Sequence, residues 1–186
     1  MAELVYQAIM SLDGYAAAPD GDISWSEPTA QVHAHVNERE AATTMYLLGR
    51  RTYDLMRVWD ALLLDETISP EEHEFAQLWR DTDKIVVSRT LPELDAPRTR
   101  VVREFDPVAM ARFLDDTEGV VSIGGPTLAA EAFAAGLVTV VRLYVHPVIL
   151  GDGLRAIPTA HRLDLDLVGS RRFDDGSVFV EYRVPR

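Results

Sequence analysis

Residues 119–128 read GVVSIGGPTL and continue into the alanine-rich stretch AAEAF at 129–133. The apolar run from Val120 to Ile123 is typical of a buried strand, and the two glycines that follow it indicate a turn. Pro126 suits the first position of a helix, where its missing N–H would have no partner, and the alanines that follow have high helix propensity. The sequence therefore predicts a strand, a glycine turn and a helix that begins at the turn.

This arrangement predicts a position for an anion. The first backbone N–H groups of the helix and the positive end of its dipole would converge beside Gly124 and Gly125, which lack the Cβ atoms that would hold an anion away. Two glycines before a helix are also common in tight turns that bind nothing. From these residues alone, an ordinary turn and a phosphate site are equally supported.

Composition limits the classes of function. A length of 186 residues fits one domain with a substantial core, and a net charge of −12 disfavours a nucleic-acid or anionic-membrane surface. The chain has no cysteine, which excludes disulfides and thiolate metal sites, and we expect no metal. It has no apolar run near the ~20 residues that span a bilayer and no secretory signal pattern. We expect a soluble cytoplasmic protein.

Two further strand ends carry side chains that suit a phosphate. The apolar run 45–48 is followed by Gly49-Arg50-Arg51-Thr52 at the start of a short helix, and the run 84–87 is followed by Ser88-Arg89. Guanidinium groups can bind phosphate in a bidentate manner. Because ligands of open α/β sheets lie beyond the carboxyl ends of the strands, we expect these turns to face one extended anionic ligand. The alternative is that the arginines only offset the net acidity.

The remaining patterns predict a mixed sheet. Residues 4–10 should form a central strand, followed by a loop over the site at 11–22. An edge strand is expected at 99–103, a long strand at 138–149, and a closing antiparallel hairpin at 163–173 and 177–184. Helices are expected at 28–43, 70–80 and 107–116, the second of them with Ser69 and Glu72 as a capping box.

Six segments, taken in order, resemble the dihydrofolate reductase-like family, specifically the reductase domain of bifunctional riboflavin-biosynthesis deaminase-reductases and their small stand-alone bacterial relatives. The segments are SLDGY at 11–15, LGRRTY at 48–53, IVVSR at 85–89, IGGP at 123–126, PVILGDG at 147–153 and FDDGS at 173–177. The resemblance spans nearly the whole chain. It implies a three-layer α/β fold with a mixed, mostly parallel sheet, helices on both faces and a C-terminal antiparallel hairpin.

The resemblance also implies an NADPH-dependent reductase that transfers a hydride to a pterin-like, pyrimidine-like or other conjugated small molecule. The riboflavin enzymes of this kind are 5-amino-6-(5-phosphoribosylamino)uracil reductases. The implied cofactor residues are Ala8, Tyr15 and Ala16 at the nicotinamide, Gly49, Arg50, Arg51 and Thr52 at phosphate and ribose, Ser88 and Arg89 at the adenosine 2′-phosphate, and Ile123, Gly124, Gly125, Pro126 and Thr127 at the pyrophosphate. The zinc deaminase pattern of the bifunctional enzymes is absent, since the chain has no cysteine.

Three residues are candidates on the substrate side. The resemblance places Trp25 near the substrate. His33 lies nearest to the position where dihydrofolate reductases carry a carboxylate, although a helical histidine is more often a partly buried structural residue. Asp13 could donate or orient a proton, but Asp-Gly is equally an ordinary turn pair, and water could supply the proton instead.

Two other classes of function compete with a reductase. The protein could be a non-catalytic nucleotide-binding or interaction protein that keeps the fold. A Rossmann-type dehydrogenase is disfavoured, because the glycine pair comes late in the chain and lacks the Gly-x-Gly-x-x-Gly pattern. We expect a homodimer, since 138–149 and the final hairpin carry more apolar residues than one covered face needs and the related riboflavin reductases associate through this part.

Overall fold

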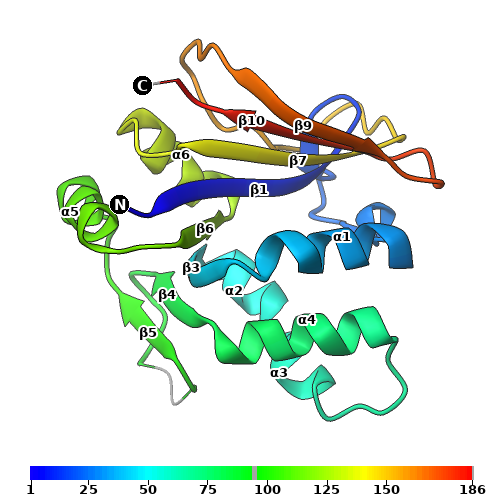
Figure 1. The fold of residues 1–186 in the computed structure, drawn as a ribbon, viewed down its shortest axis with the longest axis horizontal. Coiled ribbons are helices and arrows are strands. Elements are labelled where there is room, and N and C mark those ends of the chain that lie inside the picture. The colour runs from blue at the N-terminus through cyan, green and yellow to red at the C-terminus, as the bar shows by residue number, and fades with distance from the viewer. Residues whose placement is uncertain (94–95, 186) are drawn as a thin grey trace.

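The computed structural model describes residues 1–93 and 96–185. Its main feature is a sheet in the order β5-β4-β3-β6-β1-β7-β10-β9, which Figure 1 shows running from β9 at the top to β5 at the bottom. The strands are β1 (Glu3–Ser11), β3 (Thr43–Gly49), β4 (Asp83–Val87), β5 (Thr99–Val102), β6 (Val120–Gly124), β7 (Val140–His146), β9 (Asp166–Arg172) and β10 (Val178–Arg183).

The sheet is mixed in the way the sequence predicted. Strands β5, β4, β3, β6, β1 and β7 pair in parallel, whereas β10 pairs antiparallel with both β7 and β9. The carboxyl ends of parallel strands meet at one edge of a sheet. Within that edge Gly49 pairs with Val87, and Leu48 pairs with Gly124. The ends of β4, β3 and β6 therefore lie side by side.

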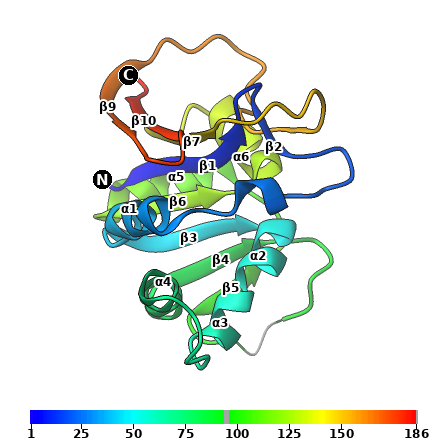
Figure 2. The same cartoon turned by 90° about the vertical axis from the view of Figure 1, so that its right-hand side faces the viewer.

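Helices cover both faces of the sheet and complete three layers. On one face lie α1 (Ala30–Glu40) and α4 (Pro70–Asp81), and on the other lie α5 (Pro107–Asp116) and α6 (Pro126–Ala134) (Figures 1 and 2). Neighbouring residues of β3 show the division, because Tyr46 packs with Trp79 of α4 while Leu47 lies in the cluster that holds Leu114 of α5 and Leu128 of α6. Alternation along a strand sends successive side chains to opposite faces.

The helix starts follow the local sequence signals. At the start of α4, the Ser69 hydroxyl accepts a hydrogen bond from the Glu72 N–H at 3.2 Å, and the Glu72 carboxylate accepts one from the Ser69 N–H at 2.7 Å. This confirms the predicted capping box. The short helices α2 (Arg50–Met56) and α3 (Val58–Leu62) follow β3, and only the first of them was expected. No helix within the described residues is long and apolar enough to cross a membrane.

Several bounds differ from the prediction. Helix α1 ends at Glu40 rather than at residue 43, because Thr43 already begins β3 and donates its hydroxyl to the Glu40 carboxylate at 2.8 Å. Strand β7 ends at His146 rather than at residue 149, since Pro147 has no N–H for the ladder. Strand β9 begins at residue 166 rather than 163.

The predicted loop at 11–22 contains a strand that the sequence did not indicate. Strand β2 (Tyr15–Ala17) pairs antiparallel with β8 (Leu154–Arg155) in a second, two-stranded sheet. The partner lies far along the chain, so local sequence carries no signal for this pairing. The η1 turn (Ser24–Ser26) then leads into α1.

Candidate active site

Two glycine turns pack against each other at the carboxyl edge of β3 and β6. Gly49 precedes α2 and Gly125 precedes α6. A Cβ atom on Gly125 would lie 2.5 Å from the Thr52 hydroxyl oxygen, and one on Gly124 would lie 2.9 Å from Leu48 Cδ2. Gly125 also has a φ of +95°, which residues with side chains rarely adopt. The packing and the positive φ therefore favour glycine at position 125 before any ligand is considered, whereas a side chain at position 124 would need Leu48 to shift.

The helices that leave these turns have free first-turn donors. Neither α2 nor α6 has a side-chain hydrogen bond at its N-cap. The N–H of Ala129 bonds to the Gly125 carbonyl at 3.0 Å, and Pro126 has no N–H. The other N–H groups of a first turn have no acceptor inside the helix, and the helix dipole places partial positive charge beside them. The edge is suited to hold an anion.

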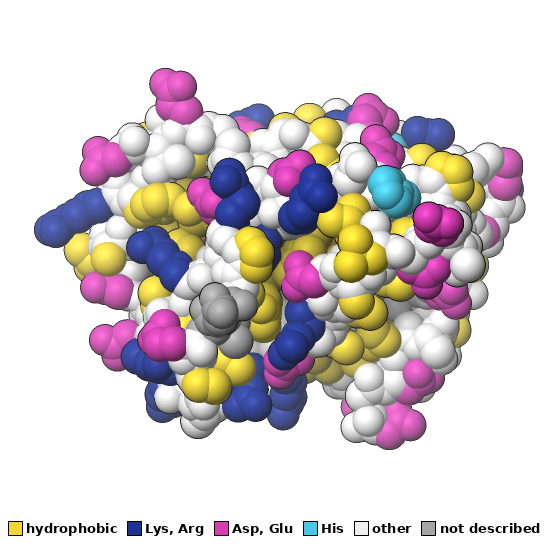
Figure 3. Space-filling view, turned by 90° about the horizontal axis from the view of Figure 1, so that it is seen from below, with side chains coloured by type: hydrophobic (Ala, Val, Ile, Leu, Met, Phe, Trp, Pro, Cys, Tyr) yellow, Lys and Arg dark blue, Asp and Glu magenta, His cyan; other side chains and the backbone are white. Residues whose placement is uncertain are grey.

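Three arginines add full positive charge at this edge. Arg50 donates to the Thr90 hydroxyl at 2.7 Å and lies 3.4 Å from the Asp54 carboxylate, which ties the start of α2 to the segment after β4. Arg51 and Arg89 are exposed, and neither has an ion pair or hydrogen bond within the described residues. Seen from below, basic side chains mix with acidic ones around a hollow in which hydrophobic side chains are visible (Figure 3). Two guanidinium groups are thus available to a ligand.

The other residues that the resemblance assigned to the cofactor differ in what they offer. Ile123 is buried in the core and Ala8 packs against the same cluster, so only their backbone could meet a ligand. The Ser88 hydroxyl accepts a hydrogen bond from the Leu91 N–H at 3.0 Å and so holds the turn after β4. Pro126 is half-buried, whereas Thr127 is exposed at the start of α6. Of these side chains, Thr127 is the most accessible to a ligand.

Asp13 holds two loops together. Its carboxylate accepts hydrogen bonds from the Ser11 hydroxyl at 2.6 Å, the Gly151 N–H at 2.7 Å and the Leu150 N–H at 3.1 Å. The bond from Ser11 is the main cause that lowers the pKa of Asp13, and together with the two backbone bonds it outweighs the opposing effect of desolvation. These contacts favour an ionised, orienting carboxylate over a proton donor.

Tyr15 and Ala16 lie in β2, beside the end of β1. The Tyr15 N–H donates to the Ser11 hydroxyl oxygen at 2.9 Å, and the Arg155 guanidinium lies over the Tyr15 ring at 5.4 Å. The Ala156 N–H bonds to the Gly14 carbonyl at 2.9 Å. The segment that the resemblance placed at the nicotinamide is therefore held at the carboxyl end of β1 by Ser11, and by Arg155 and Ala156 of the β7–β9 connection.

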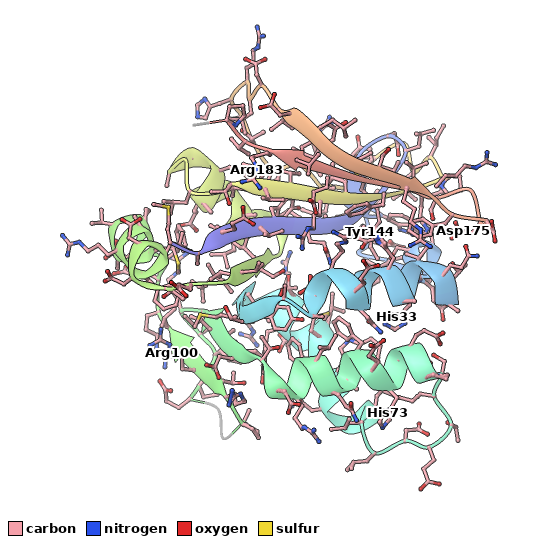
Figure 4. The ribbon with its side chains drawn as sticks, viewed as in Figure 1. His33, His73, Arg100, Tyr144, Asp175 and Arg183 are labelled. Carbon is pink, nitrogen blue, oxygen red and sulfur yellow. The ribbon has the colours of Figure 1, made fainter. Side chains whose placement is uncertain are left out.

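Trp25 lies over a buried histidine. Its ring meets that of His146 edge-on, with the centroids 6.1 Å apart, and its indole N–H donates to the Asp22 carbonyl at 3.2 Å. Desolvation lowers the pKa of His146, while the charge of Asp175 acts against it. Figure 4 shows Asp175 at the beginning of α1, and the Thr29 hydroxyl lies 3.4 Å from its carboxylate. Trp25, His146 and Asp175 form one cluster beyond the ends of β1 and β7.

His33 points away from this cluster. It lies between α1 and α4 (Figure 4), where its ring centroid is 5.6 Å from that of Trp59 and 5.8 Å from that of Phe75. Burial lowers the pKa of His33, and the carboxylates of Glu72, Glu71 and Glu74 partly oppose this. An aromatic surrounding of this kind favours the structural role of His33 over contact with a substrate.

An eight-stranded mixed sheet of this order, with helices on both faces, defines a dihydrofolate reductase-like α/β protein. The model of the RibD C-terminal domain matches residues 2–179, and the chain belongs to this family. It is 28% identical over 164 residues to the riboflavin biosynthesis protein RibD of Mycobacterium tuberculosis, covering 84% of this chain and 45% of the relative. The chain thus spans about half the length of that relative. It is 26% identical to the protein YyaP of Bacillus subtilis, covering 96% of this chain and 93% of YyaP.

Two solved structures illustrate the fold. A putative riboflavin biosynthesis protein from Shewanella sp. PV-4 superposes with a TM-score of 0.76 at 20% identity, covering 100% of both chains. Dihydrofolate reductase from Enterococcus faecalis, complexed with NADP(H), superposes with a TM-score of 0.64 at 14% identity, covering 99% of this chain and 97% of that one. At these identities the likeness concerns the fold alone.

Sequence reasoning overlooked His146 and Asp175. His146 directly precedes the segment 147–153 on which the resemblance rests, and Asp175 lies within FDDGS, which was interpreted only as a hairpin turn. The available signal was a titratable residue at the end of an apolar strand, since His146 follows Val145. Nothing local indicates that a turn much later in the chain lies next to it.

Proposed function

We propose that this protein is an NADPH-dependent reductase that transfers a hydride to a small conjugated heterocycle of the pyrimidine class. The observation that carries the proposal is the packing of the Gly124-Gly125 turn on the start of α2, beside Arg51 and Arg89, which have no partner among the described residues. This edge combines backbone donors, glycines and free guanidinium groups, which together suit a ligand with several phosphates.

The residues present fit NADPH. The start of α6 and the glycine turn would hold the pyrophosphate, and Arg51 and Arg89 would hold the 2′-phosphate of the adenosine. The protein would supply binding, orientation and exclusion of water, while the cofactor supplies the hydride. The fold neighbour from Enterococcus faecalis, complexed with NADP(H), supports this choice of cofactor.

The pyrimidine class rests on the relatives. A structural neighbour from Thermotoga maritima, with a TM-score of 0.66 at 18% identity, is a diaminohydroxyphosphoribosylaminopyrimidine deaminase and 5-amino-6-(5-phosphoribosylamino)uracil reductase. A neighbour from Corynebacterium diphtheriae, with the same TM-score of 0.66, is a pyrimidine reductase-like protein. The chain has no cysteine for the deaminase chemistry, so the proposal covers reduction only.

Calorimetry and absorbance test the proposal. We expect NADPH to bind in a titration, and its absorbance to fall when the protein is mixed with one member of a panel of 5-amino-6-(5-phosphoribosylamino)uracil, other pyrimidinones, pterins and quinones. NADPH binding without oxidation by any acceptor would favour the non-catalytic alternative. Absence of NADPH binding would overturn the proposal.

We also propose a homodimer that forms through the β9–β10 end of the sheet. This end carries exposed apolar side chains at Leu163, Leu165, Leu167, Val168 and Val178, and burial of such side chains on association would favour a dimer. We expect a dimer in light scattering at micromolar concentration and a shift to monomer in Leu167→Glu. A monomeric wild type would contradict the proposal.

A further inference from the structure

His146 has a buried nitrogen without a partner at the edge where the substrate would lie. The residue ends β7 and pairs with Ser11 of β1, at the carboxyl end of both strands. It is 6% exposed, and Nε2 has no hydrogen-bond partner among the described residues. Most buried polar atoms in folded proteins are satisfied, because leaving one unpaired is unfavourable. Because it lies at the carboxyl end of β7, this nitrogen is placed to bond with a ligand at that edge.

Asp175 is a fixed negative charge close to this imidazole. Its carboxylate accepts hydrogen bonds from the Ser177 N–H at 2.8 Å and the Ser177 hydroxyl at 2.6 Å, while the Thr29 hydroxyl lies 3.4 Å away. Although desolvation acts to raise it, the pKa of Asp175 is lowered by the Ser177 bonds and by His146. Burial lowers the pKa of His146, and the ionised carboxylate of Asp175 partly opposes this by favouring the imidazolium, which is the form that can donate a proton.

Trp25 covers His146 from a segment that is tied mainly to itself. The hydrogen bonds that the structure describes for residues 18–26 all join atoms within that segment, including the bond from the Trp25 indole. Outside the segment, the Trp25 ring meets His146 edge-on. A ligand could therefore displace Trp25 from His146 without breaking hydrogen bonds to the sheet.

The other titratable candidates of this region are already engaged. Asp13 accepts three hydrogen bonds that join two loops, and His33 is enclosed by Trp59 and Phe75 on the α4 side of α1. His146 differs from both, because its Nε2 lies at the carboxyl edge and has no partner within the described part of the chain. It is the candidate that can present a proton to a substrate.

We propose that His146, which lies near the carboxylate of Asp175, donates the proton that accompanies hydride transfer, and that Trp25 covers it until the substrate takes that place. This inference rests on the proposed reductase function. The substrate's C=N or C=O carbon gains the hydride, and the π pair moves to the nitrogen or oxygen. That atom takes the proton from Nε2, and water protonates His146 again. In sum, substrate, NADPH and one proton become reduced product and NADP⁺.

The test compares His146→Gln and Asp175→Asn with wild type and with His73→Gln. His73 is exposed on α4, and Figure 4 shows it on the opposite side of α1 from Asp175, so its replacement controls for the loss of a histidine. Turnover is measured from about pH 5 to 9 with the acceptor of the panel that wild type reduces. NADPH dissociation constants and melting temperatures are recorded for each variant, and the His146 ring is titrated by NMR.

We expect His146→Gln to lose turnover by about 100-fold or more and to lose the fall of rate with rising pH. NADPH affinity and melting should stay near wild type. Asp175→Asn removes a charge but keeps the shape, so it should move the His146 titration and the falling limb of the rate to lower pH. His73→Gln should change neither.

Three outcomes overturn the inference. If wild type is active and His146→Gln keeps the same pH profile, the inference is overturned while the proposed function stands. The same holds if Asp175→Asn moves neither the pH profile nor the titration of His146. If His146→Gln fails to fold, the Asp175→Asn and NMR measurements decide. A wild type that binds NADPH and reduces no acceptor overturns the proposed function, and this inference with it.

Discussion

The two parts of the candidate site are built in different ways. The proposed nucleotide side consists of three short segments that directly follow β3, β4 and β6, and its main donors would be backbone N–H groups and arginines. The proposed substrate side consists of side chains from distant segments, with Trp25 before α1, His146 at the end of β7 and Asp175 in the final hairpin. Figure 2 views the molecule from the side on which β1 ends, and both parts of the site lie at strand ends on this side.

The difference shows what kind of change each side can tolerate. Backbone donors remain in place as long as the turns pack, so the nucleotide side depends on glycine geometry and on charge. The substrate side depends on titratable and aromatic side chains, whose replacement need not disturb the sheet. Substitutions on the first side should change cofactor binding, and substitutions on the second should change turnover and its pH dependence.

The largest effect is expected at Gly125. Gly125→Val introduces a branched side chain at a φ of +95°, with the new Cβ 2.5 Å from the Thr52 hydroxyl oxygen. The strained backbone should lower the free energy of unfolding by about 1–3 kcal/mol, and the contact with Thr52 should lower it further. NADPH binding should weaken as well. Chemical denaturation and calorimetry measure the two effects.

A matched variant separates packing from strain. Thr52→Ala combined with Gly125→Ala removes the nearest contact but keeps the strained φ, so it should recover part of the stability lost in Gly125→Ala alone. Gly14→Ala is the control, because Gly14 has a φ of +91° and its new methyl group would meet no atom of the described residues within 4 Å beyond its chain neighbours. Equal stabilities of all variants would show that the turns do not constrain each other.

The next effect concerns the exposed arginines. Loss of one charge-assisted hydrogen bond to a 2′-phosphate corresponds to about 1.5–3 kcal/mol, so Arg51→Ala or Arg89→Ala should weaken NADPH binding by ~10- to 100-fold. NADH lacks that phosphate and should bind nearly as before. Titration calorimetry with both cofactors makes the comparison. Equal losses for NADPH and NADH would place these arginines away from the 2′-phosphate.

A smaller effect is expected in the pH dependence of stability. Burial lowers the pKa of His33, His35 and His146 below the ordinary value near 6.5. Below that value the unfolded chain binds more protons than the folded one, so the free energy of unfolding should fall as pH drops from about 7 toward 5. Glu40 acts in the opposite direction, because desolvation raises its pKa and the folded state then takes up a proton first.

Urea denaturation at several pH values within this window measures the slope. His35→Gln is the informative variant, since glutamine does not titrate and can still bond to the Tyr144 hydroxyl, which lies 2.9 Å from His35 Nδ1. The variant should flatten the curve. A wild-type stability that stays level or rises between about pH 7 and 5 would contradict the expected sign.

Much of the fold could be predicted from the sequence, because its signals are local. The capping box at Ser69, the strand and glycine turn at 120–125 and the bounds of α5 all depend on neighbouring residues. The sequence also predicted that the ends of β3, β4 and β6 face one common edge, and the pairing of these strands confirms that they lie side by side. The pairing of β2 with β8 could not be predicted, since it joins segments far apart in the chain.

The sequence by itself determined the mixed sheet, the glycine turns and the arginines at their ends, because periodicity, helix propensity and turn chemistry act over a few residues. Only the tertiary structure decided how the side chains are used. In the folded chain Asp13 accepts hydrogen bonds from the N–H groups of Leu150 and Gly151, and His33 lies between Trp59 and Phe75. The tertiary structure also brought Trp25 and Asp175 to His146. These contacts join residues that are far apart in the chain, and burial and charge at such positions arise only once the sheet has formed.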